Sequence, residues 1–382
     1  MDFPRRAWHD GPSFAALETE LKISLCIGIA CCLAAAAPVR NAAWGQNLEQ
    51  PKAHPNPPLP YFGKVDPSIP AYRPVAHLTG SLRGVESNTV TSLLQLWEDG
   101  FTRIYPGVHF QVDIGGSGQG GPRLTAGTAD FAFISREMMG REVTPFIEKF
   151  GRKPMDIEVS GGSFADKAFT DAVVFIVNKQ NPLNRISFDQ LDAIYSATHN
   201  RGLKTPITTW GQLGLTGDWA DKPIHMWGVE IPNGYDVFVN MRVLANGQWK
   251  DGIESQHTVI PLAGKVGADK YAISYTGLAW DDSPNTKVLA LSIHEGGPYI
   301  PATFQTVAAQ TYPLSRVIYI FFNQPPGKPV NPVLLEFLRY ILSRQGQQQI
   351  VKDGIYTPLP AALDVQQRQR LERAEHGCAC AN

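Results

Sequence analysis

The sequence lacks an excess of charge of either sign. Lys and Arg total 34 and Asp and Glu total 35, which gives a formal net charge of −1 over 382 residues. Proteins that hold nucleic acid by general electrostatics carry a strong positive excess, and acidic tail proteins carry the opposite. The balance excludes both classes, so we expect no nucleic-acid partner. Hydrophobic residues make up 43% of the chain, which indicates a folded body with a sizeable core.

Cysteine is absent from residues 33–377. Cys26, Cys31 and Cys32 lie near the N-terminus, and Cys378 and Cys380 lie in the last five residues. The folded body therefore has no disulfide, no thiolate nucleophile and no cysteine metal site.

Common catalytic motifs are also missing. Gly115-x-Ser117 continues with Gln119 instead of glycine, so the G-x-S-x-G nucleophile motif is broken. No H-E-x-x-H occurs, and His294-Glu295 lacks a second ligand, which favours a surface histidine over a metal site. We therefore expect a protein that is not an enzyme, with no catalytic residue, metal or cofactor.

The apolar run at residues 23–37 has 15 residues, fewer than the roughly 20 that span a bilayer. It follows Lys22 and is followed by small residues, as in the central region of a secretory signal peptide. Candidate cleavage sites lie at 35–37 and 41–43, and an uncleaved anchor is the alternative. We expect residues 1–43 to be a signal peptide or N-terminal anchor, and the body to be periplasmic or secreted.

Eight prolines fall in residues 51–74, a density that favours extended chain over helix. We interpret residues 44–74 as a linker or an arm laid on the surface, and expect the fold to begin near Val75. Residues 366–382 are interpreted as a C-terminal tail.

Beyond Val75, strand patterns alternate with helix patterns. Helical spacing predicts helices at about 90–101, 142–150, 187–195 and 331–342. Alternating or continuous apolar residues predict strands at about 82–85, 108–114, 130–135, 173–177 and 317–322. This order is typical of an α/β fold with a mostly parallel sheet covered by helices.

Small polar residues stand where strands end and helices begin. Helix N-termini leave unpaired N–H donors and a partial positive charge, so they hold anions. In a parallel sheet these loops meet at the carboxyl edge, and an arginine there adds a bidentate contact to an oxyanion. From these patterns the predicted ligand-binding residues are Ser87, Asn88, Thr89, Ser117, Gly118, Gln119, Arg136, Asn233, Gly234 and Tyr235.

The same residues have simpler interpretations. Ser87 and Thr89 would cap their own helix, and the glycine run would form only a tight turn. Arg136 would pair with Glu137 or Asp130 on the surface.

A dinucleotide-binding enzyme is a remote alternative. Gly116, Gly118 and Gly121 fit G-x-G-x-x-G between a strand and a helix, with Glu137 about 20 residues on. The motif alone is weak, and a complete strand–helix unit precedes it.

An ordered set of motifs resembles the phosphate-binding PstS-like family of ABC-transporter substrate-binding proteins, which have the type II periplasmic binding-protein fold. The set covers about Leu82 to Pro360. Its members are residues 86–89, 105–108, 115–118, 128–131 leading into 135–136, 177–182, 209–217, 325–329 and 343–346.

The resemblance implies two α/β lobes, each a mixed, mostly parallel sheet flanked by helices, joined by hinge strands at 173–177 and 317–322. Domain one would span 75–168 and 290–365, and domain two 169–289. It implies a monomer that captures phosphate or a similar tetrahedral oxyanion and delivers it to the membrane permease of an ABC uptake transporter. The family's ligand segments would correspond to Ser87, Asn88, Thr89, Ser117, Gly118, Ser135 and Arg136, all in domain one.

The sequence departs from the family in domain two. The family usually has Gly-Arg, a short spacer, then Ser-Gly-Thr at a helix start. Here Val229 stands in place of the arginine, with Asn233 and Tyr235 in place of the serine and threonine. One lost charge-assisted hydrogen bond is worth about 1.5–3 kcal/mol. The departure supports an alternative, a degenerate member that no longer binds phosphate and acts as a secreted scaffold or interaction protein.

Overall fold

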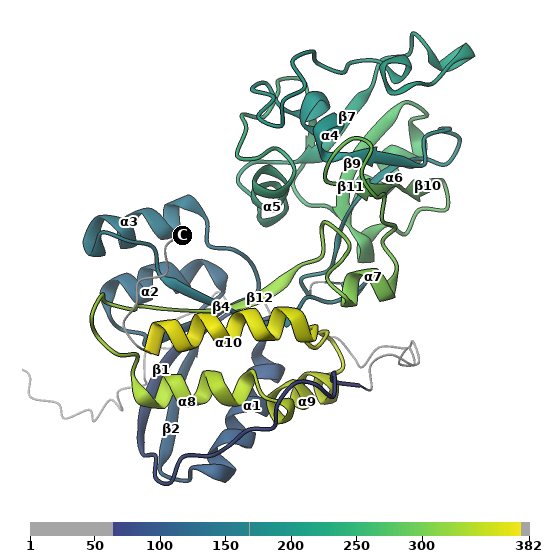
Figure 1. Cartoon of the computed structure of the whole chain (residues 1–382). Coiled ribbons are helices and arrows are strands. Elements are labelled where there is room, and N and C mark those ends of the chain that lie inside the picture. Colours follow the sequence, from purple (N-terminus) through teal and green to yellow (C-terminus); the bar gives the residue numbers. More distant parts are fainter. Residues whose placement is uncertain (1–63, 168, 376–382) are drawn as a thin grey trace, which may run out of the picture. The chain divides into compact units, whose positions relative to one another are not determined.

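The computed structural model describes residues 64–167 and 169–375 (Figure 1). The predicted signal segment, residues 44–63 of the predicted linker and all five cysteines lie outside these residues. Two five-stranded sheets form the centres of two α/β lobes, as predicted. None of the helices within residues 64–167 and 169–375 combines the length and the apolar character of a membrane span.

The first lobe is built on a sheet with the strand order β2-β1-β3-β12-β4. The strands β1 (Gly80–Glu86), β2 (Val108–Ile114) and β3 (Phe131–Ile134) are parallel to one another. The strand β12 (Val317–Phe322) lies between β3 and β4 (Met155–Gly161) and is antiparallel to both. The three parallel strands therefore end at one edge of the sheet.

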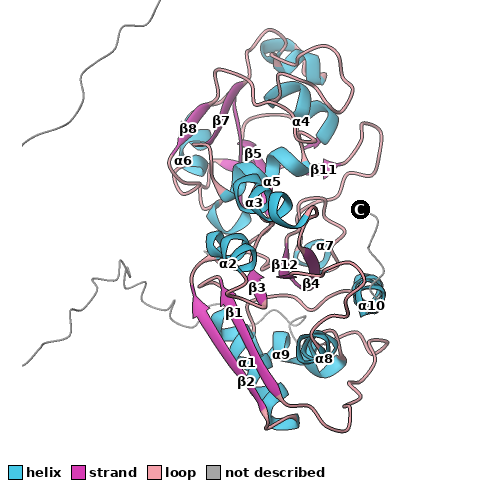
Figure 2. Cartoon of the chain, turned by 90° about the vertical axis from the view of Figure 1, so that its left-hand side faces the viewer, coloured by secondary structure: helices cyan, strands magenta, loops and turns pink. Residues whose placement is uncertain are grey.

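Helices cover both faces of this sheet (Figure 2). Alternate residues of a strand point to opposite faces, and on β3 Phe131 and Phe133 pack in one core while Ala132 packs in another. The first core also takes side chains from α1 (Thr91–Ile104), α8 (Pro332–Ile341) and α9 (Arg344–Asp353). The second takes them from α2 (Gly120–Ala126) and α3 (Gly140–Phe150). This double covering explains why strand β12 is apolar throughout.

The second lobe is built on a sheet with the order β10-β5-β9-β7-β8. Its strands are β5 (Val173–Asn178), β7 (His225–Val229), β8 (Glu254–Gln256), β9 (Ala272–Gly277) and β10 (Thr286–Val288). Its longer helices are α4 (Phe188–Tyr195), α5 (Gly234–Arg242) and α6 (Leu262–Ala268). The capping box predicted at the start of α4 is confirmed, because Ser187 and Gln190 exchange side-chain-to-backbone hydrogen bonds.

The second lobe extends beyond the predicted boundary at residue 290. The strand β11 (Ala290–Ser292) pairs with β6 (Arg185–Ser187), and α7 (Phe304–Ala308) follows. Tyr312 and Leu314 are buried in the core of the second lobe. Residues 290–314 therefore belong to the second lobe, and the boundary predicted from sequence is wrong there. Short 3₁₀ turns complete the elements at Ser117–Gln119, Trp210–Leu213, Gly217–Trp219 and Leu278–Trp280.

The described part of the proline-rich segment is an arm laid on the first lobe. Ile69 is buried, and the Tyr72 hydroxyl donates to Glu336 over 2.8 Å. The Arg344 guanidinium donates to the backbone carbonyls of Pro67 and Ile69 over 2.6 and 3.0 Å. The packed body therefore begins before Val75.

The last described helix, α10 (Ala361–Glu375), also belongs to the first lobe and lies beside α8 in Figure 1. Leu371 and Ala374 are buried in its core, and Arg370 pairs with Asp156 of β4 over 2.9 Å. The predicted start of the tail at residue 366 is therefore wrong.

Candidate anion-binding site

Three serine hydroxyls meet at the carboxyl edge of the first sheet. Ser87 follows β1, Ser117 follows β2 and Ser135 follows β3, and these strands are neighbours. The Ser135 Oγ lies 3.3 Å from the Ser87 Oγ and 3.4 Å from the Ser117 Oγ. Parallel strands explain the meeting, because all three chains leave the sheet at the same edge.

Ser87 and Thr89 do not cap the helix that follows them. The N-cap of α1 is Val90, and no side chain accepts a capping hydrogen bond there. The Ser87 and Thr89 hydroxyls instead lie 3.1 Å from each other. The capping interpretation of these residues is therefore wrong, and their hydroxyls contribute to the wall of a cavity.

That cavity has a volume of about 330 Å³ and takes residues from both lobes. Its lining residues are Ser87, Asn88, Thr89, Ser117, Ser135, Arg136, Thr170, Asn233, Gly234, Tyr235 and Arg316. Gly118 and Gln119, which were predicted to bind ligand, are exposed and do not line it. Thr170 and Arg316 line the cavity but were not predicted from the sequence.

The second lobe contributes the N-terminus of α5. The Asn233 side chain caps this helix by accepting from the Tyr235 backbone N–H over 3.0 Å, and Asp236 accepts from the Asn233 N–H in return. Gly234 faces the first lobe, since a Cβ built on it would lie 3.7 Å from the Arg136 Cδ. A helix start with its partial positive charge therefore lies near Arg136.

The Tyr235 hydroxyl is hydrogen-bonded within the protein, which argues against a role in binding the ligand. It donates to the Asp171 Oδ1 over 2.8 Å, and the Ala279 N–H donates to Oδ2 over 2.9 Å. Asp171 is fully buried, and burial raises the pKa of its carboxyl while these hydrogen bonds oppose the rise. Gly277 leaves room for the Asp171 carboxylate, because a Cβ at position 277 would lie 2.2 Å from the Asp171 Oδ2. The Tyr235 side chain is therefore part of the cavity wall, and its hydroxyl is hydrogen-bonded to Asp171.

Arg136 forms an ion pair with Glu142, which is neither of its two predicted partners. Its Nη1 and Nη2 donate to the two carboxylate oxygens of Glu142 over 2.8 and 2.7 Å. Nη1 also donates to the Glu137 backbone carbonyl over 2.8 Å. Glu142 stands in the first turn of α3, where it also accepts from the Met139 N–H. The bidentate pair is buried, with 13% of the Arg136 and 4% of the Glu142 side chain exposed.

The two carboxylates predicted to pair with Arg136 have other partners. Asp130 pairs with Arg83 over 2.8 Å. The Glu137 carboxylate accepts from the Tyr319 hydroxyl over 3.1 Å and lies 3.8 Å from the Arg242 guanidinium. The predicted surface pairing of Arg136 is therefore wrong, although Arg136 does have an ionic partner.

The two residues missed by the sequence lie where the chain passes between the lobes. Thr170 precedes β5 and has a φ of 50°, a conformation that β-branched residues rarely adopt. Arg316 immediately precedes β12, and 6% of it is exposed. The sequence signal for Arg316 was a charge next to a long apolar run. We find no local signal for Thr170.

Val229, the residue that replaces the family's arginine, does not line the cavity. It is buried in the core of the second lobe, and its N–H donates to the Tyr275 hydroxyl over 3.3 Å. Arg316, from the segment before β12, does line the cavity, and its guanidinium lies over the Phe238 ring of α5.

A buried carboxyl lies next to the hydroxyl cluster. Burial raises the pKa of Glu86 to about 7, and a hydrogen bond with Thr91 opposes the rise. Glu86 directly precedes Ser87. Near pH 7 this carboxyl is therefore about half neutral, which reduces its repulsion of an anion.

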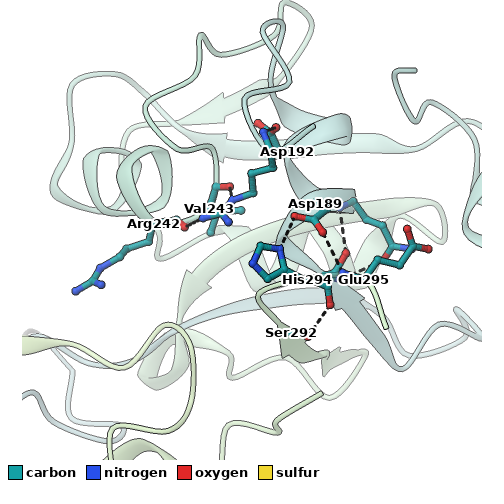
Figure 3. Close-up of polar contacts among 10 residues, drawn as sticks. Asp189, Asp192, Arg242, Val243, Ser292, His294 and Glu295 are labelled. Atoms are coloured by element: carbon teal, nitrogen blue, oxygen red, sulfur yellow. Dashed lines mark hydrogen bonds and ion pairs between the residues drawn. The ribbon is translucent and has the colours of Figure 1, made fainter. Parts of the chain in front are cut away.

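The His294-Glu295 motif takes no part in this site. Figure 3 shows the His294 ring beside Asp189, with Nδ1 3.4 Å from Oδ1, and 73% of the His294 side chain is exposed. Ser292 donates to the His294 carbonyl over 2.8 Å. His294 is a surface residue, as predicted. Within residues 64–167 and 169–375, no group of three or more His, Cys, Asp or Glu side chains is arranged to hold a metal.

The dinucleotide alternative is wrong. The glycine run follows β2, which is an edge strand, and the sheet is interrupted by the antiparallel β12. Glu137, the acidic residue about 20 positions after the motif, accepts a hydrogen bond from the Tyr319 hydroxyl.

Comparison with known proteins identifies the family. Residues 73–345 match the model of a PBP superfamily domain. The phosphate-binding protein PstS of Pseudomonas aeruginosa is 35% identical over 299 residues, covering 78% of this chain and 89% of that protein. Protein SphX of Synechococcus elongatus is 25% identical, covering 76% and 81%. The crystal structure of PstS from Borrelia burgdorferi has a TM-score of 0.51 at 17% identity, covering 74% of this chain and 99% of that one, and it shows the same fold. The chain therefore belongs to the PBP superfamily, in the PstS-like family of two-lobed periplasmic binding proteins.

Proposed function

We propose that this protein captures phosphate, or a closely similar tetrahedral oxyanion, in the cavity between Ser135 and Arg316. One observation carries the proposal: donors from both lobes line a single small cavity, and they include three clustered serine hydroxyls, a helix start and two arginines. The names of its relatives support phosphate as the ligand. Among the described lining residues there is no His, Cys, Asp or Glu, so a binding role is favoured over catalysis.

We further propose that the protein is exported and, as a monomer, delivers its anion to the permease of an ABC transporter. Family membership and the signal-like segment at 23–37 support this role. Restoration of phosphate uptake in a host that lacks its own phosphate-binding protein would test the delivery step. The scaffold alternative predicts no restoration.

Calorimetry tests the ligand. The purified protein, freed of bound anion by unfolding, dialysis and refolding, is titrated with phosphate, arsenate, sulfate and a phosphonate. We expect heat with phosphate at one anion per chain. The matched control is Arg83→Gln, which removes an arginine from the surface pair with Asp130, outside the cavity, and leaves binding unchanged. A folded protein that gives no heat with any of these anions would refute the assignment and favour the scaffold role.

A further inference from the structure

Arg316 is the only arginine within residues 64–167 and 169–375 that is almost fully buried. Its guanidinium lines the cavity, yet within residues 64–167 and 169–375 it makes neither a hydrogen bond nor an ion pair to another side chain. It lies over the Phe238 ring, 4.7 Å from the centroid, and 5.9 Å from the Tyr235 centroid. Stacking on rings orients a guanidinium while leaving its N–H donors in the plane for an acceptor.

The nearby carboxylate does not neutralise Arg316 by contact. Asp171 attracts it electrostatically, but the two Asp171 oxygens accept from Tyr235 and Ala279. A buried charge without a paired partner costs several kcal/mol, and an anion that binds beside it offsets that cost.

Arg136 presents the opposite case. Both of its terminal nitrogens donate to Glu142, in a pair whose two side chains are almost buried. The pair has no net charge, so Arg136 offers an entering anion donor groups but little electrostatic attraction.

We propose that Arg316, and not Arg136, supplies the net positive charge that holds the anion. This inference rests on the proposed function and names the residue that determines its affinity. It also explains how the site tolerates valine at position 229, because the charge enters from the segment that leads into β12.

The test compares Arg316→Met with the double variant Arg136→Gln/Glu142→Gln, which removes the other arginine together with its counter-charge. Phosphate affinity is measured by calorimetry, and melting temperature with and without phosphate. We expect Arg316→Met to weaken binding about 10- to 100-fold, the range of a lost charge-assisted hydrogen bond. The double variant should lose clearly less phosphate affinity than Arg316→Met. Without phosphate, Arg316→Met should melt no lower than the wild type, because it removes an unpaired buried charge.

Two further variants keep the test decisive. Arg316→Lys retains the charge without the planar fork, and we expect an affinity between those of the wild type and Arg316→Met. Arg152→Gln is the matched control, since Arg152 also lies over a ring, that of Phe146, but outside the cavity, and its loss should leave affinity unchanged. Wild-type affinity in Arg316→Met, or in Arg316→Gln if the methionine variant does not fold, overturns the inference. So does a double variant that loses as much as Arg316→Met. A wild type that does not bind phosphate refutes the proposed function instead.

Discussion

Replacing Glu142 by glutamine should lower the stability of the protein and raise its affinity for the anion. The glutamine keeps the size of the side chain and retains an oxygen that can accept from the Met139 N–H. It removes the negative charge that now holds both terminal nitrogens of Arg136. Arg136 lines the cavity, so the released guanidinium faces the site.

The two effects have different sizes. Removing one partner of a buried ion pair costs about 3–5 kcal/mol. Because 13% of Arg136 is exposed and the glutamine still accepts hydrogen bonds, we expect a loss of about 1–3 kcal/mol here. For a body of this length that corresponds to a fall in melting temperature of about 2–5 °C. A freed charge-assisted hydrogen bond of about 1.5–3 kcal/mol should tighten phosphate binding by about tenfold or more.

Thermal melting without phosphate and calorimetry with phosphate measure the two effects separately. Asp130→Asn is the matched control, because it breaks the exposed pair with Arg83 and should cost no more than about 1 kcal/mol without changing affinity. If Glu142→Gln binds phosphate no more tightly than the wild type, the charge of Glu142 does not weaken the attraction of Arg136 for the anion, and the electrostatic reasoning fails.

Three further predictions test the site and the fold. Ser135→Ala removes the hydroxyl at the centre of the serine cluster and should weaken phosphate binding about tenfold in calorimetry, with a change in melting temperature below about 2 °C; unchanged affinity would place the cluster outside the site. Tyr235→Phe leaves an Asp171 oxygen unpaired, which raises the pKa of Asp171 further; its loss of stability should therefore be small near pH 4 and grow as the pH rises to 7, and a loss that is the same at both values would contradict this. Leu371→Ala should cost about 2–3 kcal/mol in denaturant unfolding, whereas a residue on a loose tail would cost nothing.

The architecture could be predicted because its signals are local. The spacing of Leu93, Trp97 and Phe101 predicts α1, and the apolar run at 317–322 predicts β12. Once the parallel strands were predicted, the meeting of Ser87 and Ser135 at one edge followed from topology alone.

The charge distribution of the site could not be predicted, because it depends on contacts between distant segments. Arg316 reaches the cavity from the segment before β12, far along the chain from Ser87 and Arg136. Glu142 is only six residues from Arg136, but their contact depends on the turn between β3 and α3, which the spacing of apolar residues does not describe. The C-terminal helix was missed for a related reason. Its sequence is polar, and its buried side chains include Asp364 and Gln367, which hydrophobic periodicity does not detect.

The arm at 64–74 and helix α10 both rest on the first lobe, so the two ends of the described chain are carried by one body. A pair of fluorescent labels placed at those ends would report nothing about the angle between the lobes. A sensor built from this protein needs one of its two labels in the second lobe, for example on the exposed His257.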